Sequence, residues 1–167
     1  MGHCQKSKFI SHKVKVITVS DTRDLVTDKS GELIEQELLD AGHIVIERQI
    51  VRDEIKAIRE AVNEMNADVF IVTGGTGATL RDVTPEALEP IFDKALPGFG
   101  ELFRHLSFSE IGTATIQSRA CAGVVGGRVI FSIPGSTKAC QLAMSQIILP
   151  QLDSETKPCS LSALILR

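Results

Sequence analysis

The feature that most constrains the fold is an alternation of short β-branched runs with amphipathic stretches of helical length. The β-branched runs lie at Val14–Val19, Ile44–Val51 and Asp68–Thr73. The third run is the most continuously apolar, as is typical of a central parallel strand covered on both faces. Strands that alternate with helices predict a mostly parallel sheet between two helical layers, a three-layer α/β/α sandwich.

Capping residues and apolar periodicity place the first two helices. Ser30 is a suitable N-cap for a helix that ends at Gly42. His43, directly after this end, is expected to have a capping or connecting role. A second helix is expected to begin near Asp53, because an apolar stripe follows at helical spacing. This stripe consists of Ile55, Ile58, Val62 and Met65.

The second half of the chain contains further helices and one hairpin. Thr84 is expected to cap a helix that carries Pro85 in its first turn. Later helices are predicted at Glu101–Leu106, after a break at residues 97–100, and at Lys138–Ile148, stopped by Pro150. The hairpin is predicted where two apolar runs flank a Gly-Gly pair. Its parts are Ala120–Val125, Gly126-Gly127 and Arg128–Ile133.

Length and composition favour one globular domain and exclude some partners. The 167 residues carry a net charge of −3 and contain neither Trp nor Tyr, so a nucleic acid is not expected as a partner. No apolar run approaches the ~18 residues of a membrane span. We therefore expect a soluble cytoplasmic protein without membrane contact. The domain is predicted at 13–153, with a flexible lead-in at 1–12 and a tail at 154–167.

The four cysteines do not indicate a metal site. Cys4, Cys121, Cys140 and Cys159 form no C-x-x-C pair and lie near no H-x-x-x-H. Free cysteine generally behaves as a small buried apolar residue. Reduced, structural thiols are therefore expected.

A glycine-rich loop, Gly74-Gly75-Thr76-Gly77, follows the central strand. Its glycines allow positive φ and let backbone N–H groups approach an anion. The pattern is not a Walker A loop, because no Gly-Lys-Ser/Thr follows, and it is not G-x-G-x-x-G, because Leu80 stands where the last glycine would be. A purely conformational turn between strand and helix remains the alternative.

A second strand end has a similar composition. Pro134-Gly135-Ser136-Thr137 precedes the last predicted helix, and the N–H groups of a helix start favour negative charge. The alternative is an ordinary turn in which Ser136 or Thr137 caps the helix. Two anion-tolerant strand ends in one small domain are more informative than either alone, because parallel strands gather their ligand-binding loops at one edge.

Asp53 and Asp82 follow the second and third strands, so both carboxylates are expected at this edge. One or two carboxylates together with ligand phosphates suit Mg²⁺. For Asp53 an N-cap role is an equal alternative. Arg81, Arg119 and Lys138 could supply cations to a polyanion, or each could be an ordinary surface charge.

Taken together, the motifs resemble the MoaB/MogA family of molybdenum cofactor biosynthesis proteins, whose relatives include the gephyrin G domain. The resemblance covers roughly residues 13–153 and depends on the order and spacing of eight segments. These are Thr18–Asp21, Asp28–Gly31, Val51–Asp53, Gly74–Gly77, Arg81–Glu86, Pro97–Glu101, Ser118–Ala120 and Pro134–Ser136.

The resemblance implies a function and a set of partners. It implies an α/β/α domain that binds molybdopterin and assembles as a trimer or hexamer, with other molybdenum cofactor biosynthesis proteins as candidate partners. In the active branch, AMP is transferred from Mg-ATP to the terminal phosphate of molybdopterin, and pyrophosphate is released. ATP and molybdopterin are then the substrates and Mg²⁺ the cofactor.

The resemblance also assigns residues. The family's two functionally important aspartates match Asp53 and Asp82, which we expect to hold Mg²⁺ and position the nucleotide. The loops expected to contact nucleotide and pterin match Ser20, Asp21, Gly74, Gly75, Thr76, Gly77, Ser118, Arg119, Pro134, Gly135 and Ser136. The two glycine-containing loops are expected to hold phosphates, with Ser118 and Arg119 on the pterin side.

The chain combines features of two branches. Arg81–Glu86 is of the active type, whereas Ser107–Thr113 and Pro134–Cys140 are closer to the MoaB branch, some of whose members lack transferase activity. A non-catalytic molybdopterin carrier or scaffold is therefore the main alternative. A generic nucleotide-binding α/β domain is a third reading, which rests on fold analogy alone.

Overall fold

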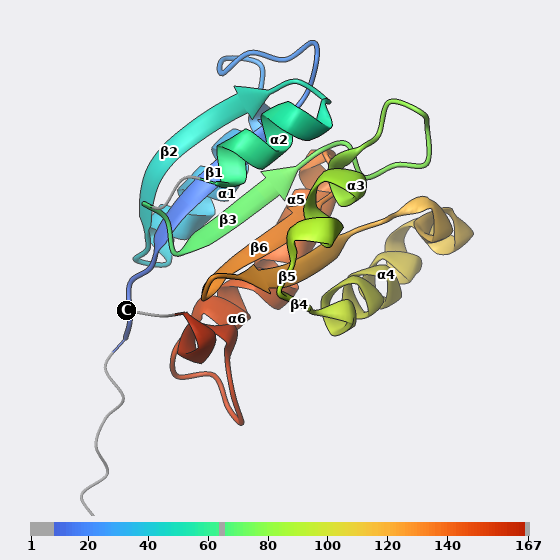
Figure 1. The fold of residues 1–167 in the computed structure, drawn as a ribbon. Coiled ribbons are helices and arrows are strands. Elements are labelled where there is room, and N and C mark those ends of the chain that lie inside the picture. The colour runs from blue at the N-terminus through green and yellow to red at the C-terminus, as the bar shows by residue number, and fades with distance from the viewer. Residues whose placement is uncertain (1–8, 64–65, 166–167) are drawn as a thin grey trace, which may run out of the picture.

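The computed structural model describes residues 9–63 and 66–165, which form one six-stranded sheet with helices on both faces (Figure 1). The strand order is β2-β1-β3-β6-β5-β4. β1, β2, β3 and β6 run parallel, whereas β5 pairs antiparallel with both of its neighbours, β6 and β4. The strands are β1 Lys13–Val19, β2 Ile44–Val51, β3 Val69–Thr73, β4 Lys94–Ala95, β5 Cys121–Val125 and β6 Arg128–Ile133. The predicted mostly parallel α/β architecture is confirmed.

Helices α2 and α3 cover one face of the sheet, and α1 and α5 cover the other (Figure 1). The helices are α1 Lys29–Asp40, α2 Ile55–Val62, α3 Thr84–Leu88, α4 Pro97–Ile111, α5 Thr137–Ala143 and α6 Leu149–Leu152. Short helices η1 Glu89–Ile91, η2 Gly112–Gln117, η3 Met144–Ile148 and η4 Leu161–Leu164 connect or extend them. No helix in the described part is long and apolar enough to cross a membrane.

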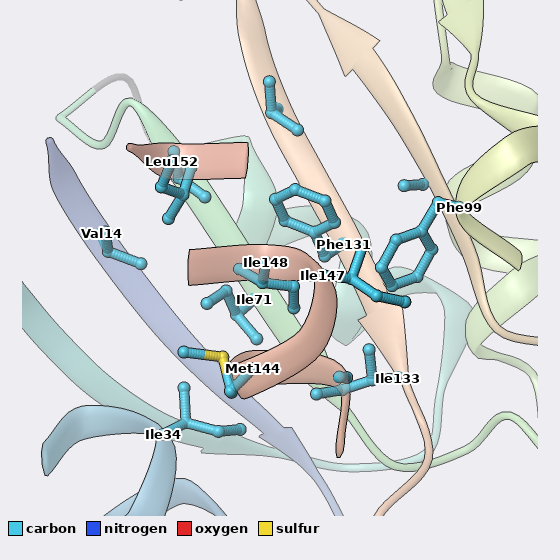
Figure 2. Packing of buried hydrophobic residues seen from close by; sticks show 14 of the residues in the cluster. Val14, Ile34, Ile71, Phe99, Phe131, Ile133, Met144, Ile147, Ile148 and Leu152 are labelled. Carbon is cyan, nitrogen blue, oxygen red and sulfur yellow. The ribbon is translucent and has the colours of Figure 1, made fainter. Parts of the chain in front are cut away.

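The strands other than β4 supply side chains to two hydrophobic clusters, one on each face of the sheet. Figure 2 shows the larger cluster, in which Phe131 of β6 lies among Phe99 of α4 and Ile148 of η3. On β1, Val14 and Val16 join this cluster, while Ile17 and Val19 pack in the smaller one beneath α2 and α3. Full burial of such a side chain contributes about 1.5–3 kcal/mol, so both clusters hold the strand ends in place.

The structure corrects the predicted N-cap of α1. Asp28 is the cap, and its carboxylate accepts from Gly31 N at 3.0 Å and from the Thr18 hydroxyl at 2.7 Å. Ser30 instead donates its hydroxyl to the Gly135 carbonyl at 2.8 Å. The hydroxyl of Ser30, which the local sequence marked as a helix cap, thus bonds Gly135, a residue distant in sequence.

The starts of α2 and α3 also differ from the predictions. α2 begins after Glu54, so Asp53 is not its N-cap. Val83 holds the cap position of α3, and Thr84 is the first helical residue. The Thr84 hydroxyl donates to the Gly74 carbonyl at 2.9 Å, which removes it from a capping role.

The predicted break at residues 97–100 is wrong, because these residues form the first turn of α4, Pro97–Ile111. Proline is tolerated there, since the first N–H groups of a helix have no intrahelical acceptor. Pro150 likewise does not end the last helical segment. It lies in the first turn of α6, after the π-helical η3 has shifted the hydrogen-bond register.

The predicted hairpin is confirmed. Gly126 and Gly127 connect β5 to β6 with φ of +55° and +76°, a conformation that favours glycine at both positions. β4 was not predicted, because its two residues are too few for a recognisable pattern.

His43 connects two segments, as expected. It is buried, and its Nδ1 accepts from the backbone N–H of His12 at 3.3 Å. His12, at the end of the predicted lead-in, is also buried, while residues 1–8 and Met65 lie outside the described part. The division into lead-in, domain and tail stays a prediction.

Candidate functional site

The loops after β3 and β6 meet at one edge of the sheet and form a cavity of about 330 Å³. The two loops are in contact, because a Cβ added at Gly135 would lie 3.3 Å from the Gly74 Cα. The cavity is lined by Gly74, Gly75, Thr76, Gly77, Asp82, Phe103, Ser107, Ile111, Gln117, Ser118, Pro134, Gly135, Ser136 and Ala139. Most of the site residues predicted from the sequence are therefore brought together.

Glycine is required at the start of the glycine-rich loop. Gly74 has a φ of +102°, and a Cβ added there would lie 2.4 Å from the Val19 carbonyl oxygen. Gly75 has a φ of +63°, and its added Cβ would approach the Thr84 hydroxyl at 2.3 Å. The backbone of this loop thus passes closer to β1 and α3 than any side chain would allow.

All four carbonyl oxygens of Gly74–Gly77 accept hydrogen bonds from the protein. Thr84 donates its hydroxyl to Gly74 at 2.9 Å and its backbone N–H to Gly75 at 3.0 Å. Arg119 donates its backbone N–H to the third carbonyl at 3.1 Å and Nε to the fourth at 2.8 Å. By contrast, the N–H groups of Gly75 and Thr76 donate to no acceptor within the described residues.

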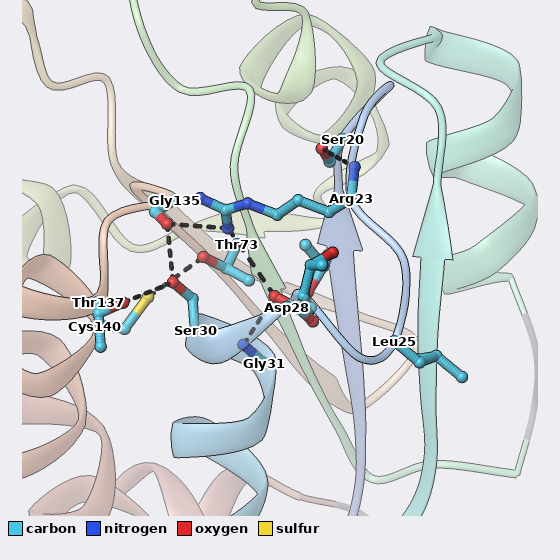
Figure 3. A network of polar contacts seen from close by, with 12 residues as sticks. Ser20, Arg23, Leu25, Asp28, Ser30, Gly31, Thr73, Gly135, Thr137 and Cys140 are labelled. Carbon is cyan, nitrogen blue, oxygen red and sulfur yellow. Dashed lines mark hydrogen bonds and ion pairs between the residues drawn. The ribbon is translucent and has the colours of Figure 1, made fainter.

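The turn after β6 is held in the same way, through its carbonyl oxygens (Figure 3). The Gly135 carbonyl accepts from the Ser30 hydroxyl at 2.8 Å and from Arg23 Nη1 at 3.2 Å. The guanidinium of Arg23 also lies 3.8 Å from the buried carboxylate of Asp28. Figure 3 shows these side chains converging on Gly135 from the segment that precedes α1 and from its first turn.

The neighbouring carbonyl, that of Pro134, accepts from the Thr73 hydroxyl at 3.0 Å and from the Cys140 thiol at 3.3 Å. Ser136 caps α5 by accepting from Ala139 N, so the predicted capping role is present. The backbone N–H groups of residues 135 and 136 have no protein acceptor in the described part of the chain. Both loops therefore have occupied carbonyls and available N–H donors, which is the arrangement of an anion-binding site.

Asp82 borders the glycine-rich loop and is held as an anion. Its Oδ2 accepts from the Thr79 backbone N–H at 3.0 Å and from the Thr79 hydroxyl at 2.5 Å. These bonds, led by that from the Thr79 hydroxyl, lower the pKa of Asp82 below its ordinary value. The carboxylate is thus ionised at neutral pH.

Asp53 lies at the same edge. An added Cβ at Gly75 would lie 2.9 Å from Asp53 Oδ1, as one at Gly77 would lie 2.8 Å from Asp82 Oδ2. The Val83 N–H donates to Asp53 Oδ1 at 3.3 Å. Burial raises the pKa of Asp53, and the negative charge of Asp82 adds to this effect. The two aspartates are therefore close enough to repel each other.

This pair is a candidate metal site of a particular kind. Within residues 9–63 and 66–165, no cluster of three or more His, Cys, Asp or Glu side chains could hold a metal ion without help. Mg²⁺ is commonly bound by one or two carboxylates together with ligand phosphates and water. Two neighbouring carboxylates beside two anion-binding loops fit that donor set.

The other predicted residues lie at the rim or behind it. Ser20 Oγ accepts from the N–H groups of Thr22 and Arg23, which closes the turn after β1. Asp21 forms an ion pair with Arg81 and accepts from the Asp53 N–H at 3.3 Å. Neither Ser20 nor Asp21 lines the cavity between the two loops.

Ser118 and Arg119 occupy different environments. Ser118 lines the cavity, and its hydroxyl oxygen is buried with no hydrogen-bond partner in the described structure. A buried hydroxyl without a partner is costly, so this atom is a candidate ligand contact. The Arg119 guanidinium instead contacts the protein through Gly77, Asp82 and Glu86, and lines a larger neighbouring groove of about 980 Å³.

Some residues of the site were not identified from the sequence. The roles of Thr73 and Arg23 are revealed only by partners distant in sequence, Pro134 and Gly135. Thr79 was missed although its partner, Asp82, is only three residues away. Lys138, which was considered as a cation for a ligand, lines a separate groove between α4 and α5.

Comparison with known proteins gives a consistent result. Residues 15–154 match a family model described as "Probable molybdopterin binding domain". The chain is 48% identical over 158 residues to molybdenum cofactor biosynthesis protein B of Escherichia coli strain K12, with 92% of this chain and 93% of that protein covered. It is 54% identical over 143 residues to the protein of the same name from Halalkalibacterium halodurans, with 82% and 84% covered.

A solved structure of a molybdenum cofactor biosynthesis protein B superposes on this fold with a TM-score of 0.83 at 46% identity. The match covers 86% of this chain and 92% of that one. The family match spans most of the chain, and both loops and both aspartates lie inside it. The chain therefore belongs to the molybdopterin-binding domain family, among the MoaB/MogA proteins, with the molybdenum cofactor biosynthesis protein B sequences as its relatives.

Proposed function

We propose that this protein binds molybdopterin and transfers AMP from Mg-ATP to its terminal phosphate, releasing pyrophosphate. The observation that carries the proposal is the pair of touching loops with occupied carbonyls and available N–H groups, bordered by Asp53 and Asp82. Such an edge offers donors to phosphate groups and carboxylates to their metal counterion.

In the reaction, an oxygen of the molybdopterin phosphate attacks the α-phosphorus of ATP, and the bond from that phosphorus to the β-phosphate oxygen breaks. A phosphate monoester has a second pKa of ~6, so the nucleophile is largely ionised at neutral pH and needs no general base. The work of the protein is to hold two anions in line and to stabilise the departing charge.

The residues divide this work. The N–H groups of the glycine-rich loop and of the Gly135-Ser136 turn hold the phosphates, and the Ser118 hydroxyl lies on the pterin side. Asp82 and Asp53 would hold Mg²⁺, which supplies positive charge against the pyrophosphate. Asp21 and Ser20 order the rim beside Asp53.

The test is direct. Purified protein is mixed with molybdopterin and Mg-ATP, and the products are analysed for adenylylated pterin and pyrophosphate. We expect both in equal amounts, and neither when Mg²⁺ is omitted. Binding of molybdopterin without pyrophosphate release would reject the transferase.

That second result would favour the other candidate, a non-catalytic molybdopterin carrier or scaffold. The observation in its favour is that the relatives at 48–54% identity carry the MoaB name, together with the MoaB-like segments at 107–113 and 134–140. It predicts tight molybdopterin binding that neither ATP nor Mg²⁺ alters.

We also propose that the chain forms a homo-oligomer, a trimer or a hexamer. Leu102, Phe108 and Ile111 on α4 and the neighbouring Ile116 are large apolar side chains that remain exposed in the single chain. Contiguous exposed apolar surface is typical of an interface. Light scattering on the purified protein measures the mass, and a monomer would contradict the proposal.

A further inference from the structure

Arg119 connects the two ends of the segment that carries Asp82. Its Nε donates to the Gly77 carbonyl and its Nη2 to the Asp82 carbonyl, both at 2.8 Å. Its third nitrogen, Nη1, forms an ion pair with Glu86 at the start of α3. All three nitrogens of the guanidinium are thus engaged by the protein.

The segment between those two ends is held by local bonds and by one ion pair. Asp82 N donates to the Thr79 carbonyl at 3.2 Å, and both Thr79 donors bond the Asp82 carboxylate. Arg81 forms an ion pair with Asp21 at the rim, and the pKa of the Asp82 carboxylate is lowered first by the Thr79 hydroxyl and further by the Gly77 backbone N–H. The Thr79 bonds fix the shape of the turn, whereas contacts with more distant residues fix its place relative to the glycine-rich loop. Leu80, at the tip, is fully exposed. Arg119 lies just before β5, 42 residues after Gly77 and 37 residues after Asp82 in the sequence.

Arg119 is itself held in position. Arg104 of α4 donates Nη1 to the carbonyls of Ser118 and Ala120, at 3.3 and 3.2 Å, so the backbone is anchored on both sides of Arg119. The backbone N–H of Arg119 also bonds Thr76. A side chain with such a fixed origin and a planar fork of donors sets the distance between its acceptors.

We propose that Arg119 is a positioning residue, which fixes Asp82 against the glycine-rich loop and contacts no ligand itself. Glu86 balances its charge, so that the carboxylate of Asp82 remains available to a metal ion. The kinetic consequence rests on the proposed function, whereas the ordering of the segment does not.

The rival interpretation is direct contact with a ligand phosphate. In that case Arg119 would leave Glu86 and two carbonyl oxygens unpaired, and a lysine could supply the same charge to the phosphate. Under the positioning role a lysine fails, because one ammonium group cannot reach acceptors at both ends of the segment.

The experiment compares Arg119→Lys with Arg59→Lys. Arg59 is the matched control, because it also donates to two backbone carbonyls, those of Glu86 and Ala87, but outside the site. The first readout is amide hydrogen exchange of residues 75–83 in the ligand-free protein. We expect about 10-fold faster exchange in Arg119→Lys and wild-type exchange in Arg59→Lys.

The second readout is the kinetics of AMP transfer. We expect Arg119→Lys to lower kcat by roughly 10- to 100-fold with the KM for molybdopterin within about threefold, because a misplaced group slows the step it serves. Unchanged exchange, or a rise in KM with kcat retained, would overturn the positioning role. Absence of turnover in the wild type would overturn the proposed function alone, since exchange still decides the role of Arg119.

Discussion

The two loops that we propose bind phosphate reach the same edge by different means. The Pro134–Ser136 turn is short, and neighbouring side chains on β3, α1 and α5 hold its carbonyls. The segment from Gly74 to Asp82 is longer, reaches a fully exposed tip at Leu80 and is held by Arg119 and by the ion pair between Arg81 and Asp21. The first loop is therefore a rigid part of the fold, whereas the second is a longer segment held by side chains that are distant in sequence. Substitutions should separate the two.

The largest effect is expected at the long segment. Asp82→Ala should slow AMP transfer by roughly 10²–10³-fold, about 3–4 kcal/mol, because it removes a carboxylate from the metal. Molybdopterin binding should change little, since the turn after β6 is untouched. Steady-state kinetics and a binding titration measure both quantities.

Asp40→Ala serves as the control, because this aspartate lies at the end of α1, where its carboxylate accepts from Gln36 Nε2 at 2.8 Å. Turnover should match the wild type in the control. Equal rates in both variants would show that Asp82 has no metal role.

The same substitution in each loop should have unequal costs. Gly74→Ala places a Cβ 2.4 Å from a carbonyl oxygen at a φ of +102°, so we expect a loss of about 3 kcal/mol in unfolding free energy. Gly135→Ala meets its nearest atom at 3.3 Å and should cost less than about 1 kcal/mol. Urea denaturation measures both, and similar values would refute the comparison.

The rigid turn can be loosened by one hydroxyl. Ser30→Ala removes the donor at 2.8 Å from the Gly135 carbonyl, and we expect a loss of about 1 kcal/mol in unfolding free energy. Ser145→Ala removes an exposed hydroxyl that bonds a carbonyl within the last helical segment and should cost under about 0.5 kcal/mol. The opposite order would mean that the turn does not depend on Ser30.

The smallest effects concern pH, and the two aspartates should act in opposite directions. The folded-state pKa of Asp53 is raised, so its ionisation costs stability as the pH rises through its unfolded and then its folded pKa. The pKa of Asp82 is lowered, so its ionised form contributes stability that is lost as the pH falls through its folded pKa.

Thermal unfolding of two variants tests these signs. Asp53→Asn should raise the Tm at pH 7 relative to the wild type, with the difference vanishing toward pH 3. Asp82→Asn should lower the Tm at pH 7, and this difference should also shrink in acid. Shifts of the same sign at pH 7 would contradict the assigned environments.

The strands other than β4, the hairpin and the shared edge could be predicted from the sequence because their signals are local. The Val69–Val72 run is apolar throughout, Gly126-Gly127 suits a tight turn, and the carboxyl ends of parallel strands lie together by topology. The contact between the loops at Gly74 and Gly135 follows from the adjacency of β3 and β6.

What could not be predicted depends on partners distant in sequence. Ser30 has the composition of a cap, but Gly135, 105 residues away, takes its hydroxyl. The Thr84 hydroxyl bonds the Gly74 carbonyl and therefore does not cap α3. Arg119 bonds loop carbonyls that no spacing rule connects to it. Pro97 signals equally a break or a helix start, and only packing decides between them.

The occupied carbonyls of the two loops have a consequence for selectivity. Because the carbonyls of both loops are already bonded, their backbone offers only N–H donors to a ligand, and the carboxylates of Asp53 and Asp82 lie beside these donors. A neutral hydroxyl-rich molecule finds few complementary atoms there. We therefore expect this edge of the sheet to select ligands by charge and to favour an anion that carries a bound cation.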